Sequence, residues 1–228
     1  MSTNLIDAAK GFFTDELIEK AAAYLGESET SVAKAVTGII PAILGGILNK
    51  TANYEGAGVV ARMVEDQYTK EVLHDPGIFF GNEGGALLNK SAGFLNNLYG
   101  NKTDGITNLV SNFAGIKPTS STTLLCTALP AVLGLLGKYA EGGDRDVAAL
   151  VNSQKDNIAA AVPQGLNLGG VLGNWGGGLN NLRVKTGDAQ SYATAPRLGA
   201  AVKMLLALLV IGVVIGAWYL FHTNARKM

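Results

Sequence analysis

Apolar residues recur with helical spacing in two similar stretches of the chain. In each stretch they lie three or four residues apart, as on one face of an amphipathic helix: Leu17, Ala21, Tyr24 and Leu25 in the first, and Ile106, Leu109, Val110 and Phe113 in the second. Thr14 and Thr103 precede these faces and are favourable N-caps. Gly26 and Gly115 follow them, where glycine commonly ends a helix. The pattern predicts two short helices with matching ends.

A longer and almost wholly apolar helix is predicted after each short one, over about 28–50 and 118–139. Pro41 and Pro130 fall in the middle of these helices, where proline removes a backbone hydrogen bond, so we expect a kink in each. A helix that is apolar all round is either a core helix or a membrane span. The apolar run Ile39–Leu48 has only ten residues, which is short for a span, and we favour a buried core helix.

A third, amphipathic helix is predicted over about 55–72 and again over about 144–162. Glycine-rich connectors follow at 81–85 and 165–178. Stretches in which β-branched and polar residues alternate, as they do in strands, are scarce along the chain. The predicted fold class is therefore all-α.

The two sets of predicted helices repeat with a period of about 89 residues. Pro41 and Pro130 are 89 positions apart. The same offset joins further pairs: Thr14 with Thr103, Leu17 with Ile106, Tyr24 with Phe113, Gly26 with Gly115, Ser31 with Ser120, and Gly45 with Gly134. After a deletion of two residues, Val60–Gln67 aligns with Val147–Gln154. The constant order and spacing of these matches favour a duplicated helical repeat.

A third copy begins after the second and stops early. The motif LNNL at Leu95–Leu98 recurs at Leu179–Leu182. We therefore divide this body into repeat 1 over residues 1–80, repeat 2 over residues 81–165, and a glycine-rich partial repeat or linker over residues 166–197.

The chain ends in an apolar segment of the length that crosses a bilayer. Between Leu198 and His222 only Lys203 is charged, and the run Met204–Phe221 has 18 uncharged residues. We predict a transmembrane helix over 198–222, followed by a short tail over 223–228. Trp218 and Tyr219 lie near one end of this helix and are suited to a membrane interface. The side chains that we expect to anchor the helix are Met204, Leu205, Leu206, Leu208, Leu209, Trp218 and Tyr219.

Two features of this segment bear on topology and association. Gly212 and Gly216 are four residues apart, a spacing that allows close packing of two membrane helices. The N-terminus lacks the basic and apolar regions of a signal peptide, and basic residues precede the span, so we expect a cytoplasmic N-terminal body. The opposite orientation stays open, because Arg226 and Lys227 follow the span.

Charge and cysteine content narrow the classes of function. The net charge is zero, and since Lys203, Arg226 and Lys227 lie in the C-terminal segment, residues 1–197 carry 18 acidic and 15 basic side chains. No basic run is present, so we expect no nucleic-acid partner. Cys126 is the only cysteine and lies in an apolar stretch, which predicts a small buried core residue and no internal disulfide.

The sequence offers no recognisable active site. The two histidines, His74 and His222, have no nearby nucleophile or metal-ligand pattern, and His222 is interpreted as an interface anchor. The glycine-rich stretch Gly169–Gly178 lacks the Gly-Lys-Ser/Thr element of a phosphate loop. Glu65 and Asp66 are adjacent, and a solvated helix face accounts for them. We expect no enzyme activity, no cofactor and no metal.

A family resemblance rests on the stretch LIDAAKGFFTDELIEKAAAYLGESETSVAKAVTGIIPAILGGILNK. Its helix end at Leu25–Gly26, the Ser/Thr-led start of the next helix, and Pro41–Gly46 resemble the bacterial domain-of-unknown-function family 937, the YidB-like proteins, over about residues 5–160. The resemblance implies a helical, self-associating domain without established enzymatic activity. Some relatives join it to a single span and an OmpA-like peptidoglycan-binding domain. Here only Thr223–Met228 follow the predicted span, so the resemblance gives no basis for expecting wall binding.

These features together predict a scaffold in the bacterial inner membrane. The helical body, anchored to the lipid bilayer by the C-terminal span, would self-associate into a homo-oligomer. Two similar surfaces in each chain favour head-to-tail contacts, which close into a ring or grow into a filament. One alternative is a membrane-tethered adaptor that recruits a cytoplasmic or another envelope protein. Another is a membrane-active effector whose helices at 35–50 and 124–137 insert into a bilayer. An enzyme ranks below these.

Overall fold

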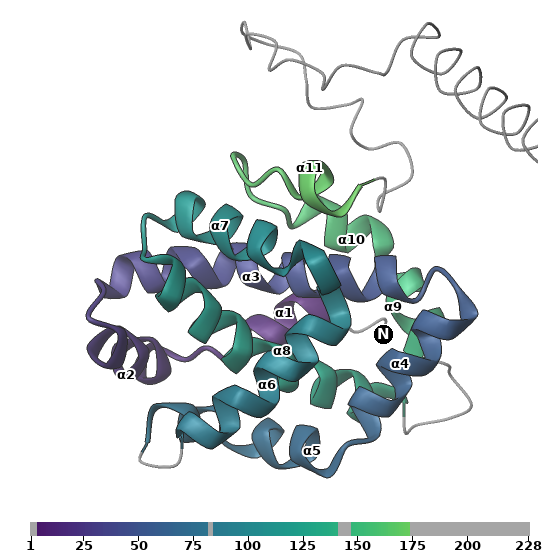
Figure 1. Cartoon of the computed structure of the whole chain (residues 1–228), viewed down its shortest axis with the longest axis horizontal. Coiled ribbons are helices and arrows are strands. Elements are labelled where there is room, and N and C mark those ends of the chain that lie inside the picture. Colours follow the sequence, from purple (N-terminus) through teal and green to yellow (C-terminus); the bar gives the residue numbers. More distant parts are fainter. Residues whose placement is uncertain (1–3, 82–83, 141–146, 174–228) are drawn as a thin grey trace, which may run out of the picture. The chain divides into compact units, whose positions relative to one another are not determined.

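A computed structural model describes residues 4–81, 84–140 and 147–173 of the chain (Figure 1). These residues form helices and turns and contain no strand, which confirms the predicted all-α class for this part of the chain. The chain divides into two units, Met1–Val184 and Lys185–Met228, and all the described residues belong to the first. The predicted transmembrane helix lies outside the described residues.

Two sets of helices follow each other along the chain. The N-terminal half, defined as residues 4–81, contains α1 (Leu5–Lys10), α2 (Asp15–Leu25), α3 (Glu29–Lys50), α4 (Tyr54–Glu65), α5 (Gln67–His74) and the 3-10 helix η1 (Pro76–Phe80). The C-terminal half, defined as residues 84–173, contains α6 (Gly84–Tyr99), the 3-10 helix η2 (Gly100–Lys102), α7 (Thr103–Ala114), α8 (Pro118–Ala140), α9 (Val147–Ser153), α10 (Lys155–Ala160) and α11 (Leu168–Leu172).

Local capping explains where α2 begins and where α2 and α7 end. The Thr14 hydroxyl accepts a hydrogen bond from the Leu17 amide at the start of α2. Gly26 and Gly115 adopt left-handed conformations, with φ of 61° and 73°, and their amides bond back to the final turn. The predicted cap at Thr103 is wrong. Because η2 leads directly into α7, Thr103 already has helical angles, and its hydroxyl donates instead to the Gly100 carbonyl.

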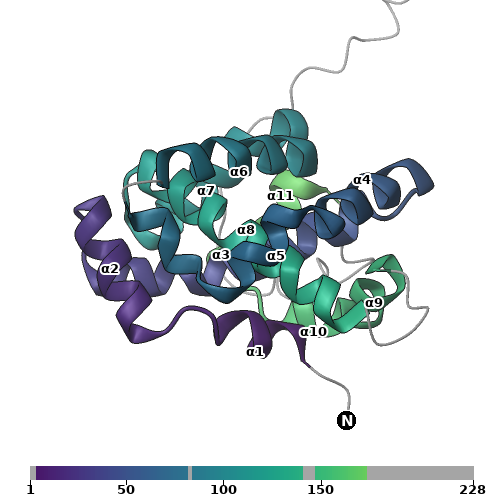
Figure 2. The ribbon, with the colours of Figure 1, turned by 90° about the horizontal axis from the view of Figure 1, so that it is seen from below.

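Tyr24 does not lie on the buried face of α2, as the spacing of apolar residues predicts. It is 51% exposed, and its ring lies 5.5 Å from that of Phe80. The reason is that α2 lies at one end of this unit, where it contacts only α3 and η1 closely (Figure 2). The narrow face formed by Leu17, Ala21 and Ala22 is buried in its place.

The two long helices, α3 and α8, form the centre of the core. Both are long and apolar enough to cross a membrane, by length and composition alone, but 78% and 83% of their most apolar stretches are buried inside the protein. This burial agrees with their interpretation as core helices. Pro41 and Pro130 are buried within α3 and α8. The kink predicted at each proline stays a prediction.

The third predicted helix is broken in both halves. The backbone of Asp66 is extended, with ψ of 131°, and separates α4 from α5. The Thr69 hydroxyl, which is buried, donates a 2.7 Å hydrogen bond to the Met63 carbonyl across this break. In the C-terminal half, Gln154 separates α9 from α10. The prediction of one continuous helix over 55–72, and of another over 144–162, was therefore wrong. Each segment changes direction so that both of its parts pack against the core.

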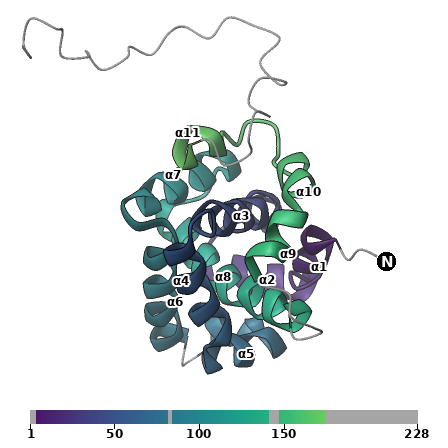
Figure 3. The same ribbon diagram turned by 90° about the vertical axis from the view of Figure 1, so that its right-hand side faces the viewer.

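The two halves interlock around these central helices. Helix α3 of the N-terminal half contacts every described α-helix of the C-terminal half, α6 to α11. Figure 3 shows it flanked by α7, α8, α9 and α10. Helix α8 in turn contacts α1, α4, α5 and η1 of the N-terminal half. Apolar residues of both halves merge into one continuous core, so the two halves do not form separate domains.

The first part of the predicted glycine-rich linker is folded. Leu166, Leu168 and Leu172 are buried, and α11 packs against α3 and α7. The Lys102 ammonium donates a 3.1 Å hydrogen bond to the Leu172 carbonyl and so ties α11 to η2. Residues 174–197 lie outside the described residues.

Candidate functional site

The described residues do not bring together a set of reactive side chains. Among residues 4–81, 84–140 and 147–173, no group of three or more His, Cys, Asp or Glu side chains is placed to hold a metal ion. His74 is exposed at the end of α5. Buried hydroxyls donate hydrogen bonds to backbone carbonyls: Ser111 donates to the Ile116 carbonyl at 2.6 Å and Ser121 to the Thr107 carbonyl at 2.9 Å. These interior polar groups therefore have a structural role.

One open hollow of about 500 Å³ lies where the end of α3 meets α9 and α10. Its lining is mainly small and apolar, with three polar side chains: Leu48, Thr51, Ala52, Ala148, Ala149, Asn152 and Lys155. The Thr51 hydroxyl is already engaged, since it donates to the Ile47 carbonyl at 2.9 Å. Lys155 is the only charged group in the lining, so the hollow has no acid–base pair for catalysis.

The strongest candidate for a functional region is the surface along which the two halves meet, here called the half–half interface. Its clearest polar contact is made by Glu27, in the turn between α2 and α3. The Glu27 carboxylate accepts hydrogen bonds from the Lys117 amide at 3.0 Å and from the Ser120 hydroxyl at 2.7 Å. These bonds, from the amide first, lower the pKa of Glu27. A residue of the N-terminal half thus caps the start of α8.

The two long helices begin in different ways. Ser28 caps α3 by accepting from the Ser31 amide at 3.1 Å. The residue at the same offset in the C-terminal half is Lys117, whose side chain has no acceptor to offer. The Lys117 ammonium points back instead and lies 3.5 Å from the Gly26 carbonyl. The sequence pattern did not indicate the contact between Glu27 and the start of α8, because the partners of Glu27 are 90 or more positions away.

Replacing Glu27 with alanine is expected to lower the free energy of unfolding by about 1 kcal/mol, the usual effect of losing a helix cap. Because folding lowers the pKa of Glu27, its contribution is complete above about pH 4.5 and disappears as the pH falls through the lowered value. Urea unfolding at several pH values measures this difference. Glu19→Ala, at an exposed position on α2, is the matched control. An equal effect of both changes would contradict the capping role.

Further charged and aromatic contacts cross the half–half interface. The Lys90 ammonium on α6 lies 2.8 Å from an Asp66 carboxylate oxygen at the α4–α5 break. The Lys34 ammonium on α3 lies 5.1 Å from the centre of the Phe113 ring on α7. Both pairs lie at the periphery of the half–half interface. They therefore contribute more to the alignment of the two halves than to the stability of the fold.

Glycines allow the helices of the two halves to approach closely. A methyl group on Gly134 of α8 would lie 2.8 Å from the Thr69 carbonyl oxygen of α5. On Gly46 of α3, it would lie 2.5 Å from the ring of Tyr99 at the end of α6. The Tyr99 hydroxyl is buried without a hydrogen-bond partner among the described residues, and burial raises its pKa. These contacts leave no room for larger side chains.

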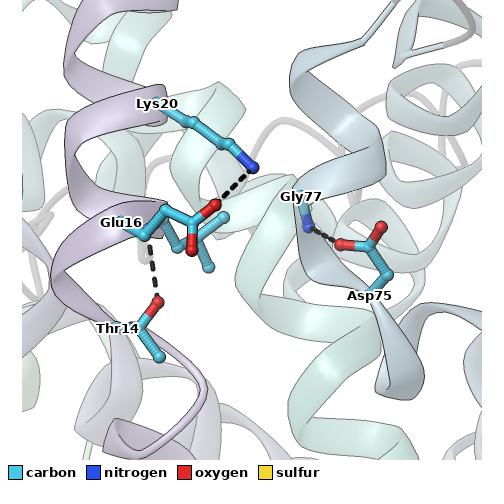
Figure 4. A network of polar contacts seen from close by, with 6 residues as sticks. Thr14, Glu16, Lys20, Asp75 and Gly77 are labelled. Atoms are coloured by element: carbon cyan, nitrogen blue, oxygen red, sulfur yellow. Dashed lines mark hydrogen bonds and ion pairs between the residues drawn. The ribbon is translucent and has the colours of Figure 1, made fainter.

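Two polar contacts lie where α2 faces η1, one within each element. Figure 4 shows Lys20 of α2 paired with Glu16 at 2.9 Å and facing the turn that begins at Asp75. The Asp75 carboxylate accepts from the Gly77 amide at 2.9 Å and so caps η1. The pKa of Lys20 is raised, first by its bond to Glu16 and to a smaller extent by the Asp75 charge. The Lys20–Glu16 pair of this cluster is exposed to solvent.

The site residues predicted from the sequence fall into two groups. Pro41 and Pro130 lie in the central helices α3 and α8, which form much of the half–half interface. The predicted membrane-anchor residues and the glycine pair lie outside the described residues: Met204, Leu205, Leu206, Leu208, Leu209, Trp218, Tyr219, Gly212 and Gly216. The sequence pattern did not indicate the roles of Glu27, Gly46 and Tyr99 in the half–half interface.

Cys126 is buried in α8, as predicted, with 2% of its surface exposed. Burial raises the pKa of its thiol from 9.0 to about 11. Modification by a thiol reagent at pH 8 is therefore expected to be at least about 100-fold slower in the native protein than in denaturant. Absorbance after addition of an aromatic disulfide measures this rate. Equal rates would mean that α8 is accessible in the native state.

Comparisons with known proteins place the chain in a family. No curated protein and no solved structure shows significant similarity to it. A family model described as "Bacterial protein of unknown function (DUF937)" matches residues 7–139, which is more than half of the 228 residues. The match includes α2, α3, α7 and α8, and thus both central helices of the half–half interface. The chain therefore belongs to the bacterial DUF937 family.

Proposed function

We propose that the chain is a non-enzymatic helical scaffold, anchored to a membrane by its C-terminus, that self-associates into a homo-oligomer. The observation that carries this proposal is the half–half interface. Two similar sets of helices fit each other over a shared apolar core, and the polar groups at their boundary serve packing and capping. When one of two complementary surfaces belongs to a neighbouring chain, the contact is head-to-tail and repeats from chain to chain.

Matching features of the two halves support this proposal. Helices α2 and α7 both end at a glycine in the left-handed conformation, and α3 and α8 each contain a buried proline near the middle. The helix breaks at Asp66 and Gln154 also fall at nearly matching positions of the aligned segments. We propose that the two halves derive from one repeat, with a period of about 89 residues, followed by a glycine-rich linker.

Membrane attachment rests on the sequence of residues 198–222. Their length and lack of charge support a single C-terminal transmembrane helix. We place the helical body on the cytoplasmic side of the bacterial inner membrane, since basic residues precede the span. Gly212 and Gly216 offer a second means of association within the bilayer.

The mass of the detergent-extracted full-length protein tests the proposal, beside a chain that ends at Arg197. Light scattering or native mass spectrometry at high protein concentration is expected to give a large, discrete complex for both, because the association is assigned to the helical body. A monomer in both cases would contradict the scaffold and favour an adaptor that recruits another envelope or cytoplasmic protein. Association of the full-length chain alone would assign it to the span.

One observation favours a second candidate, a membrane-active effector. Helices α3 and α8 have the length and apolar composition of membrane spans. The chain that ends at Arg197 can be added to liposomes filled with a self-quenching dye. Rapid dye release would support insertion. We expect none, since most of the apolar surface of both helices is buried in the core.

A further inference from the structure

The half–half interface is built almost entirely from contacts between segments that are far apart in the chain. Helix α3 packs against α6 to α11 of the C-terminal half, and against α1, α2 and α4 of its own half. Helix α8 packs against α1, α3, α4, α5 and η1 of the N-terminal half, and against α6, α7 and α9 of its own half. Both central helices thus depend on the opposite half of the chain for much of their cover.

The specific contacts also cross this boundary. The Glu27 cap on α8, the Lys90–Asp66 ion pair and the packing of Tyr99 on Gly46 each join one half to the other. The close approach of Gly134 to the Thr69 carbonyl does the same. If the two halves were on different polypeptides, all these contacts would be unchanged.

We propose that the half–half interface accepts the corresponding half of a second copy of this chain, so that chains join by exchanging halves. This inference rests on the proposed self-association and names the surface responsible for it. An exchanged pair of chains forms the same core as a single chain, so that only the turn between the halves, closed by a hydrogen bond from the Gly84 amide to the Gly81 carbonyl, must open. When exchange continues from chain to chain, it gives a closed ring or an open filament.

Concentration decides between the closed and exchanged forms. Within one chain the two halves are held at an effective concentration of about millimolar, which favours the closed form in dilute solution. Attachment of the chains to one membrane raises their local concentration and keeps them in a common orientation. The proposed anchor and the proposed exchange are therefore expected to act together.

Complementation between two defective full-length chains tests the proposal. One carries Ile40→Asp and Ile43→Asp, which place charges in α3 at positions with 0% exposure. The other carries Leu125→Asp and Leu129→Asp, at 0% exposed positions in α8. Each chain refolded alone in detergent is expected to show no cooperative thermal transition by circular dichroism.

An equimolar mixture of the two, refolded together from denaturant, contains one intact copy of each half. It is expected to regain up to about half of the wild-type transition, in a species with the mass of two or more chains. The matched control mixes the α3-defective chain with a chain carrying Ile39→Asp and Leu44→Asp, which is defective in the same half. This mixture has no intact N-terminal half and is expected to regain nothing.

A test mixture that regains no more than the control would overturn the exchange proposal. This result is distinct from failure of the scaffold, which the mass of the wild-type protein decides. Large wild-type complexes without complementation would keep the scaffold and assign its assembly to another surface. If the test mixture regains the transition but the wild-type protein is monomeric, the result would support the interface and contradict the scaffold proposal.

Discussion

Replacing Gly56 with alanine lowers the free energy of unfolding, by an expected amount of about 3 kcal/mol. Gly56 lies in the first turn of α4, and a methyl group there would overlap the carbonyl oxygen of Lys50, the last residue of α3. The overlap involves the backbone of α3, so no side chain can rotate to relieve it. The Gly56 amide also donates a 2.8 Å hydrogen bond to the Asn53 side chain, which fixes the start of α4. Urea unfolding followed by circular dichroism measures the loss.

Gly58 provides a control in the same helix. The nearest atom to a methyl group there is the end of the Arg62 side chain, at 3.7 Å, and this side chain can move. Gly58→Ala is therefore expected to raise stability by about 0.5–1 kcal/mol, since alanine favours a helix more than glycine does. Two changes of the same sign would mean that α3 and α4 do not meet closely at Gly56.

Replacing Tyr99 with alanine is expected to cost about 3–5 kcal/mol, the usual range for removing a buried aromatic ring. Tyr99 is 6% exposed, and its ring fills the space that Gly46 leaves beside α3. Its loss would open a cavity between α6 and α3, at the half–half interface. Thermal or urea unfolding measures the change.

Tyr99→Phe separates the ring from the hydroxyl. The buried hydroxyl has no hydrogen-bond partner among the described residues, and its raised pKa keeps it neutral. A buried hydroxyl without a partner costs about 1–3 kcal/mol, so phenylalanine is expected to leave stability unchanged or to raise it. A clear loss of stability would instead reveal a hydrogen-bond partner, such as a bound water molecule.

The helices that the sequence predicted well are those whose ends depend on neighbouring residues. Thr14 and Ser28 cap helices that begin at the next residue, and Gly26 and Gly115 end helices by their own conformation. These signals act over a few positions, so they are readable in a single sequence. The burial of α3, α8 and Cys126 was also predicted, because a helix that is apolar on all sides needs an apolar environment and the run Ile39–Leu48 is short for a membrane span.

Features set by tertiary contacts were not predictable in this way. The break at Asp66 lacks glycine and proline, and depends on how α5 packs along α8. Tyr24 has helical spacing but lies at the end of the unit, where no element covers it fully. Glu27 caps a helix that begins about 90 positions later. The interpretation of residues 198–222 as a span stays a prediction.

The neighbours of α3 have a consequence for synthesis of the protein. Lys50 ends α3, but α11, the last of its neighbours, ends at Leu172. At about 5–20 residues per second, a ribosome needs roughly 6–25 s to make the intervening chain. During this time an almost wholly apolar helix lacks most of its cover. We therefore expect nascent chains of this protein to bind chaperones that recognise exposed apolar segments, and we expect neighbouring chains on one polysome to have time to meet before either has closed.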